Sequence, residues 1–160
     1  MYYAKSPDEL LSPEDLSKMS GLEFMEAMRT GKLPAPPISQ TLNYRLHEVE
    51  KGRVVFRGTP EFSFTNPLGT VHGGWYGTLL DSSMACAVQT MVDRGATYTT
   101  LEYKINILRS IPLGTEIDCV GIADHVGRST GVAHGEIRGV ADGKLYATGS
   151  TTCIVMRLPG

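Results

Sequence analysis

One stretch of the chain, residues 66–92, constrains the fold more than any other. It reads NPLGTVHGGWYGTLLDSSMACAVQTMV, a polar turn followed by a long run without proline. Apolar side chains recur in that run at three- and four-residue steps, at Leu79, Leu80, Met84, Ala87, Val88 and Met91. This period predicts one buried helix over residues 74–92, about 28 Å long at 1.5 Å per residue. The rest of the chain must then pack around this helix.

Two glycines, Gly73 and Gly74, lie where the predicted helix begins. The first turn of a helix has free N–H groups and the positive end of the helix dipole, and glycine lets a ligand approach that backbone closely. Such an end can hold a carbonyl oxygen that becomes negative during a reaction. We expect the Gly73 N–H to serve as this oxyanion donor and Gly74 to contact the substrate. The alternative is that glycine serves there only for close packing.

Asp81 is the one charged residue in the apolar run. A lone carboxylate on a buried helix face is costly unless it has a task or a partner, so we expect a nucleophile or a general base. The alternative is a satisfied polar residue. Asp81 lies eight residues beyond Gly73, about 12 Å along the axis, whereas reacting atoms must come within about 3–3.5 Å. If both groups are catalytic, an antiparallel helix from a second subunit must close the gap.

Strand patterns surround the helix and predict a domain over residues 39–160. Residues 44–49 and 53–57 form a predicted hairpin, with residues 61–65 as a continuation. Four more strands are predicted after the helix, at residues 97–108, 116–125, 129–140 and 145–156, and the first of them is rich in β-branched and aromatic residues. The expected fold is α+β, an antiparallel sheet of five to six strands wrapped around one central helix.

Residues 1–38 predict an N-terminal helical extension. Ser20 and Glu23 form a capping box that opens a helix, which stops at Gly31. Residues 33–37 contain three prolines and predict an extended linker. We expect the helix to pack against the body, with a role in lining a substrate tunnel as the alternative.

These features resemble the PaaI-like (phenylacetate-pathway type) hotdog-fold acyl-CoA thioesterases over about residues 40–156. The resemblance rests on His72-Gly73-Gly74, an Asp nine positions after the histidine, an Asn six before it, and the strand order. Further matching segments read YTTLEYKINILRSIPLG, VGRS and ADGKLYATGSTTCIV. The resemblance implies a hotdog fold and hydrolysis of an aromatic or medium-chain acyl-CoA in a site shared between subunits. It also implies a homodimer, and we expect a dimer of dimers, a homotetramer.

The resemblance assigns further site residues. Asn66 would orient water or the thioester, although Asn-Pro is also a common turn. Thr100 matches a hydroxyl position that helps to hold water, and Thr99, on the opposite face, is the alternative because the register is open by one residue. His72 belongs to the same set, where we expect it to fix the loop by hydrogen bonding. Coenzyme A contacts are expected at strand ends or bulges, with solvated side chains as the alternative, at Arg109, Ser110, Arg128 and Ser129.

Composition and motifs exclude several partners. The net charge is −2 and no Lys/Arg run exceeds an isolated pair, so we expect no nucleic acid. No apolar stretch reaches membrane-spanning length and the N-terminus lacks signal-peptide features, so we expect no membrane association and a cytoplasmic location. The cysteines show no metal spacing and are expected to be buried free thiols, typical of a reducing compartment, at Cys86, Cys119 and Cys153. We expect no metal and no cofactor.

Two other functions stay open at this point. An enoyl-CoA hydratase or dehydratase of the same fold would need an Asp–His acid/base pair close together, whereas His72 and Asp81 lie nine residues apart. A non-catalytic acyl-CoA binding module is the second alternative. A serine hydrolase is disfavoured because the sequence has no G-x-S-x-G motif.

Overall fold

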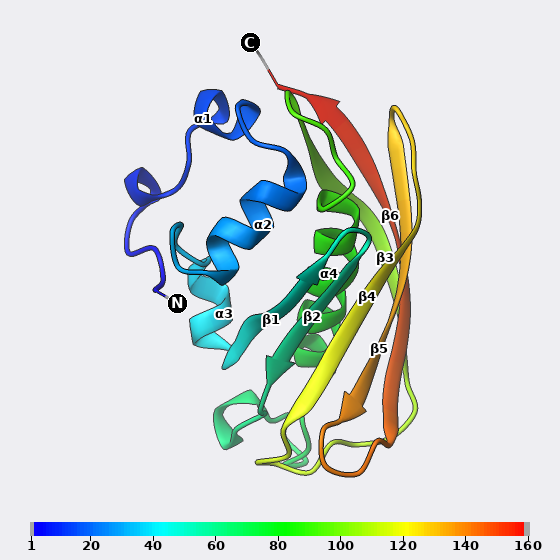
Figure 1. Ribbon diagram of the computed structural model, residues 1–160. Helices are drawn as coiled ribbons and strands as arrows, with labels where there is room; N and C mark the ends of the chain where they lie inside the picture. The colour runs from blue at the N-terminus through cyan, green and yellow to red at the C-terminus, as the bar shows by residue number, and fades with distance from the viewer. Residues whose placement is uncertain (1, 159–160) are drawn as a thin grey trace.

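The long helix α4 (Gly73–Gln89) lies against a single curved sheet of six antiparallel strands in the computed structural model, which describes residues 2–158 (Figure 1). The strand order is β1-β2-β4-β5-β6-β3. The strands are β1 Tyr44–Glu50, β2 Arg53–Gly58, β3 Ala96–Ile107, β4 Ile117–Val126, β5 Thr130–Gly139 and β6 Leu145–Arg157. The predicted α+β fold with one central helix is therefore confirmed.

Helix α4 supplies the centre of the core. Leu79, Leu80 and Met84 have no exposed surface, because the sheet covers one side of the helix and the N-terminal extension covers another. The sheet comes so close that a Cβ added to Gly121 of β4 would lie 2.2 Å from the Ser83 carbonyl oxygen of α4. Glycine is needed at this crossing because any larger residue would push the helix away from the sheet.

The helix ends at Gln89 rather than at residue 92, where the apolar period predicted its end. Thr90 is the C-cap residue. Its hydroxyl donates to the Ala87 carbonyl at 2.6 Å and accepts from the Gly52 N–H of the β1–β2 turn at 2.8 Å. The bond from Gly52 connects the end of α4 to the β1–β2 hairpin.

The predicted continuation of the hairpin over residues 61–65 is wrong. A short 3₁₀ helix, η2 (Phe62–Phe64), occupies this position. The chain then folds back on itself, because Thr65 forms an isolated bridge with Val71 and the Phe64 carbonyl accepts from the His72 N–H at 2.8 Å. This reversal delivers the chain to the start of α4.

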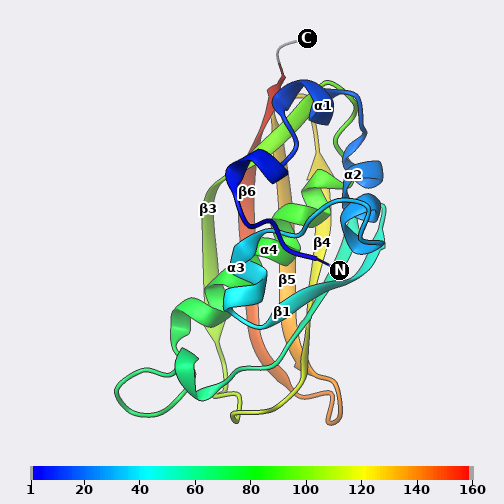
Figure 2. The ribbon, with the colours of Figure 1, turned by 90° about the vertical axis from the view of Figure 1, so that its left-hand side faces the viewer.

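The N-terminal extension packs on α4 on the side away from the sheet (Figures 1 and 2). Its helical elements are η1 Pro7–Glu9, α1 Pro13–Ser17, α2 Gly21–Arg29 and α3 Pro37–Thr41. The capping box of α2 is present, with Glu23 N to Ser20 Oγ at 3.2 Å and Ser20 N to Glu23 Oε2 at 2.7 Å. Met25 and Met28 are buried, so the predicted packing of this helix is confirmed.

The linker is extended only in part. Ala35 pairs with the N-terminal segment through the Ala35 N–H to the Tyr2 carbonyl, at 2.8 Å. Pro37, which the sequence placed in the extended linker, instead begins α3, because proline is well suited to the first turn of a helix, where no N–H partner is needed.

Among residues 2–158, no helix has the length and apolar character required to span a membrane.

Candidate active site

The start of α4 holds one unbonded backbone donor. His72 is the N-cap residue, and its Nδ1 accepts from the Gly74 N–H at 2.8 Å. The His72 carbonyl accepts from the Trp75 N–H at 3.0 Å. Within residues 2–158 the Gly73 N–H has no hydrogen-bond partner. The ring of His72 thus fixes the first turn, and Gly73 presents the N–H that remains free for a ligand.

Asp81 lies on α4 beside the edge strand β3. Thr100 Oγ1 donates a hydrogen bond to Asp81 Oδ1 at 2.9 Å, whereas Thr99 is exposed. The register left open by the sequence therefore places Thr100, not Thr99, at the carboxylate. Asp81 is half-buried, and this burial raises the pKa of its carboxyl, while the Thr100 hydrogen bond lowers it by a smaller amount. A carboxylate with a raised pKa is a stronger base.

One protomer does not bring Gly73 and Asp81 together. They lie on the same helix, separated by eight residues, or about 12 Å along its axis. Within one protomer, the Gly73 N–H is a donor suited to an oxyanion, and the Asp81 carboxylate is a base too far away to act on the same carbonyl.

Asn66 uses its side chain within its own loop. Its Oδ1 accepts from the Leu68 N–H at 2.9 Å and from the Thr70 N–H at 3.3 Å, and its Nδ2 donates to Thr70 Oγ1 at 2.9 Å. These bonds form a side-chain-stabilised turn. Asn66 therefore shapes the loop that precedes His72, and one Nδ2 hydrogen is left for any contact with a ligand.

The four residues expected at coenzyme A form two separate pairs. Arg109 and Ser110 follow β3 and lie near the first turns of α4, where Tyr76 Oη donates to the Arg109 carbonyl at 3.4 Å. Arg128 and Ser129 lie between β4 and β5, and Arg128 lines a surface hollow with Val92, just past the other end of α4. All four are exposed, and one protomer does not gather them around one ligand.

Comparison with known proteins shows similarity to one superfamily. Residues 68–146 match the family model described as the thioesterase superfamily. The chain is similar to this superfamily over these residues. Its fold is similar to that of a putative thioesterase from Ralstonia eutropha, described as a phenylacetic acid degradation-related protein, with a TM-score of 0.74, 29% identity and coverage of 82% of this chain and 98% of that chain. The predicted resemblance to PaaI-like proteins and the predicted hotdog fold are confirmed.

Two curated relatives match about two thirds of this chain. A putative esterase from Caenorhabditis elegans is 31% identical over 106 residues, which are 66% of this chain and 62% of the relative. The chain therefore spans less than two thirds of that relative. Human acyl-coenzyme A thioesterase 13 is 29% identical over 101 residues, or 63% of this chain and 71% of the relative.

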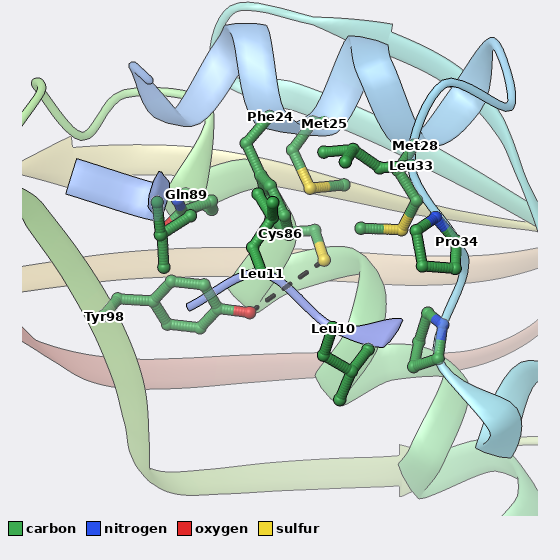
Figure 3. Close-up of a pocket in the computed structure, with 12 residues that line it drawn as sticks. Leu10, Leu11, Phe24, Met25, Met28, Leu33, Pro34, Cys86, Gln89 and Tyr98 are labelled. Carbon is green, nitrogen blue, oxygen red and sulfur yellow. Dashed lines mark hydrogen bonds between the residues drawn. The ribbon is translucent and has the colours of Figure 1, made fainter. Parts of the chain in front are cut away.

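A cavity of about 340 Å³ is lined in part by α2, the helix for which the sequence offered a tunnel-lining role as an alternative (Figure 3). It lies between the extension, α4 and β3, and its walls include Leu11, Phe24, Met28, Cys86, Gln89 and Tyr98. One signal for Tyr98 was available, because it lies two residues before Thr100 on the same strand face. The other walls come from residues distant in sequence, and no local pattern connects them.

The thiol and phenol groups at this cavity are unsuited to nucleophilic roles. Burial raises the pKa of the Cys86 thiol to about 12 and that of the Tyr98 hydroxyl well above its ordinary value. Cys86, Cys119 and Cys153 are free, as predicted, although Cys86 is only half-buried. Trp75, Tyr76 and Met84 belong to the core.

Proposed function

We propose that the protein is an acyl-CoA thioesterase, which hydrolyses an acyl-coenzyme A to the free acid and CoA in a site shared between two subunits. The proposal is carried by two groups on α4. The Gly73 N–H has no hydrogen-bond partner within residues 2–158, and the half-buried Asp81 carboxyl has a raised pKa. The match of residues 68–146 to the thioesterase superfamily and the similarity to human acyl-coenzyme A thioesterase 13 support the reaction class.

The exposed edge of β3 supports the shared site. Strand β3 has twelve residues, and β6 is its one neighbour among residues 2–158. Leu101 is 59% exposed and Tyr103 46% exposed on this edge strand, and an exposed edge strand with apolar side chains is a template for pairing with another chain. Two such edges paired about a two-fold axis would place the two α4 helices antiparallel. Asp81 of one subunit would then lie toward Gly73 of the other.

The chemistry needs only these groups. The thioester carbonyl oxygen accepts a hydrogen bond from the Gly73 N–H, which stabilises the negative charge of the tetrahedral intermediate. Asp81 of the facing subunit removes a proton from water as the water oxygen bonds to the carbonyl carbon. The C–S bond then breaks, and the proton returns to the leaving thiolate to give CoA. Thr100 holds the carboxylate in place through its hydrogen bond.

Direct attack by Asp81 is the other route, through a mixed anhydride that water then cleaves. The two routes differ in the origin of the oxygen. A single turnover in ¹⁸O-labelled water places the label in the free acid if Asp81 is a base. If Asp81 is the nucleophile and water attacks the anhydride at the Asp81 carbonyl, the label enters Asp81 itself.

The finer details of the proposal concern substrate, assembly and place of action. Arg109, Ser110, Arg128 and Ser129 contact the phosphates and polar groups of CoA from two subunits, and Asn66 steadies the loop or the bound thioester. The acyl group is aromatic or medium-chain, and two dimers associate into a tetramer. The three free thiols support action in a reducing compartment such as the cytoplasm.

A panel of acyl-CoA thioesters, assayed for release of free thiol, tests the proposal. We expect thiol release by the wild-type protein and loss of release in Asp81→Asn. A crotonyl-type thioester is included, with its double-bond absorbance followed in parallel. Loss of absorbance without thiol release would overturn the proposal in favour of hydration.

A further inference from the structure

The reversal loop, residues 61–71 before α4, carries the two most exposed large apolar side chains within residues 2–158. Leu68 is 87% exposed and Phe62 is 79% exposed. Leu68 lies in a fixed turn, because the Asn66 side chain accepts from its N–H at 2.9 Å and the Asn66 carbonyl accepts from the Gly69 N–H at 2.9 Å. This turn holds the leucine away from the core of its own subunit, so its side chain is free to contact another molecule.

The cavity under the N-terminal extension borders on the edge strand β3 (Figure 3). Tyr98 of β3 and Cys86 of α4 form its walls together with the extension, and no Lys, Arg, Asp or Glu lines it within residues 2–158. Leu11 and Leu16 in its walls are only half-buried, and Leu10 is 48% exposed. One protomer therefore leaves about 340 Å³ of apolar hollow unfilled, next to the strand whose second edge has no neighbour among residues 2–158. Exposed apolar walls of this kind favour an apolar occupant.

The proposed dimer fixes which parts of the two subunits meet. If Gly73 of one subunit faces Asp81 of the other, the two-fold axis passes α4 halfway between these positions, at Gly77. Gly77 lies against the edge strand, because a Cβ added to it would lie 3.3 Å from Tyr103 Oη of β3. One axis can therefore pass both the middle of α4 and the edge of β3, as a two-fold pairing of these elements requires.

The same axis carries the reversal loop of one subunit toward the cavity of the other. Cys86, in the cavity wall, lies nine residues after Gly77, about 13–14 Å along the helix, whereas α4 begins only about 6 Å before Gly77. The level of Cys86 is therefore about 7–8 Å beyond the start of the antiparallel α4, where the reversal loop lies. Figure 2 shows this loop projecting past the β3 edge at the lower left, with the extension in the upper half of the view. A half-turn about an axis perpendicular to the sheet brings the loop of one subunit to the extension of the other.

We propose that the reversal loop of each subunit inserts Leu68 into the cavity under the N-terminal extension of the other subunit. The inference rests on the two-fold arrangement of the proposed function, and it gives the extension a partner, a second copy of this chain. The contact is apolar on both sides, and it buries a leucine that one protomer leaves exposed. It also reaches the candidate site, because the reversal loop continues through His72 into Gly73. The extension of one subunit therefore steadies the oxyanion donor of the other.

Cross-linking between two engineered thiols tests the contact directly. The full-length variant Leu11→Cys/Leu68→Cys is treated with a short bismaleimide and separated on a denaturing gel. Within one chain the two positions lie at opposite ends of α4, about 25 Å apart along the helix, so a link between them joins two subunits. We expect more covalent dimer than from either single variant.

Leu11→Cys/Val140→Cys is the matched control for the cross-link. Val140 is 42% exposed and follows β5, two strands away from β3, so the arrangement does not bring it to the cavity. A monomeric protein, or a dimeric preparation with no covalent dimer above this control, overturns the proposal.

A double-mutant cycle tests whether the loop and the cavity are coupled. We expect Leu68→Ala to raise the dissociation constant of the dimer at least about tenfold, the scale of burying one leucine side chain, and Val140→Ala to leave it unchanged. Leu11→Trp narrows the cavity and should weaken the dimer as well. Together, Leu11→Trp and Leu68→Ala should weaken it less than the product of their separate effects, because the smaller residue makes room for the tryptophan. Independent effects, measured by analytical ultracentrifugation, overturn the contact, including the case in which a small apolar ligand fills the cavity.

Thiol release, measured on the same preparations, separates this inference from the proposed function. If the wild-type protein cleaves no acyl-CoA thioester but the Leu11→Cys/Leu68→Cys variant forms the covalent dimer, the thioesterase proposal fails and the contact between loop and extension stands. If the wild-type protein cleaves thioesters while the loop and cavity variants neither cross-link nor couple, the contact fails and the thioesterase proposal stands.

Discussion

Thr100 on β3 donates a hydrogen bond to Asp81 on α4, with 2.9 Å between Thr100 Oγ1 and Asp81 Oδ1. This bond joins the edge strand to the central helix at the one carboxylate of α4. Two opposite influences act on that carboxyl. Burial raises its pKa, and the Thr100 hydroxyl lowers it by a smaller amount because it stabilises the charged form.

Removal of the Thr100 hydroxyl should shift the pH profile of the enzyme. In Thr100→Val the influence that lowers the pKa of Asp81 is lost and the burial remains, so the pKa rises further. Because the reaction needs the carboxylate, the acidic limb of kcat/KM should move to higher pH. Thr99→Val is the matched control, since Thr99 lies on the opposite, exposed face. Equal profiles for the two variants would remove Thr100 from the site.

Asp81→Asn should abolish turnover without harming the fold. Loss of the general base or nucleophile costs about 10²–10⁴-fold in kcat, measured as CoA release. The folded pKa of Asp81 is raised, so its ionisation destabilises the folded state as pH rises above the ordinary carboxyl pKa. The neutral amide avoids this effect and still accepts from Thr100. We expect the Tm of the variant at pH 7 to equal or exceed that of the wild type, and a marked fall in Tm would indicate a structural role.

Gly73→Pro removes the single proposed oxyanion donor. Proline is accepted at the first helical position, and His72, at φ −63° and ψ 138°, already has a conformation allowed before proline. We expect kcat to fall about 10²–10³-fold, with thermal unfolding close to wild type.

Gly73→Ala is the matched control for that variant, because it keeps the N–H. The added Cβ would meet Ile107 Cδ1 at 3.4 Å, an ordinary contact, so we expect most of the activity to remain. Similar activity in the proline and alanine variants would contradict the assignment of the donor.

Periodicity predicted most of the fold, because each element follows local rules. The apolar period of three and four residues predicted α4, and the capping pair Ser20 and Glu23 predicted the start of α2. The sequence failed at residues 61–65, where Phe62 and Phe64 alternate as in a strand but form part of a chain reversal instead. That reversal depends on contacts of Phe64 with His72, which a strand pattern cannot reveal.

The candidate site was predictable in its residues but only partly in its arrangement. The separation of Gly73 and Asp81 followed from helix geometry alone. The choice between Thr99 and Thr100 did not, because a strand pattern repeats every two residues and β3 has an irregularity just after Thr100. The cavity depends on how residues 10–36 fold over α4, which no local sequence pattern predicts.

The shared site makes one demand that a site within one chain does not. Each site would combine Gly73 of one subunit with Asp81 of the other. In a mixed dimer of Asp81→Asn and Gly73→Pro subunits, one site therefore keeps both intact groups and the other site has neither.

Subunit mixing is the most direct measurement of this arrangement. The two inactive variants are unfolded and refolded together in equal amounts, and CoA release is compared with that of each variant refolded alone. About half of the dimers should be mixed, each with one intact site of two, so the account predicts recovery of about a quarter of wild-type activity. Activity no greater than that of the separate variants, in a preparation shown to contain mixed dimers, would contradict the shared site.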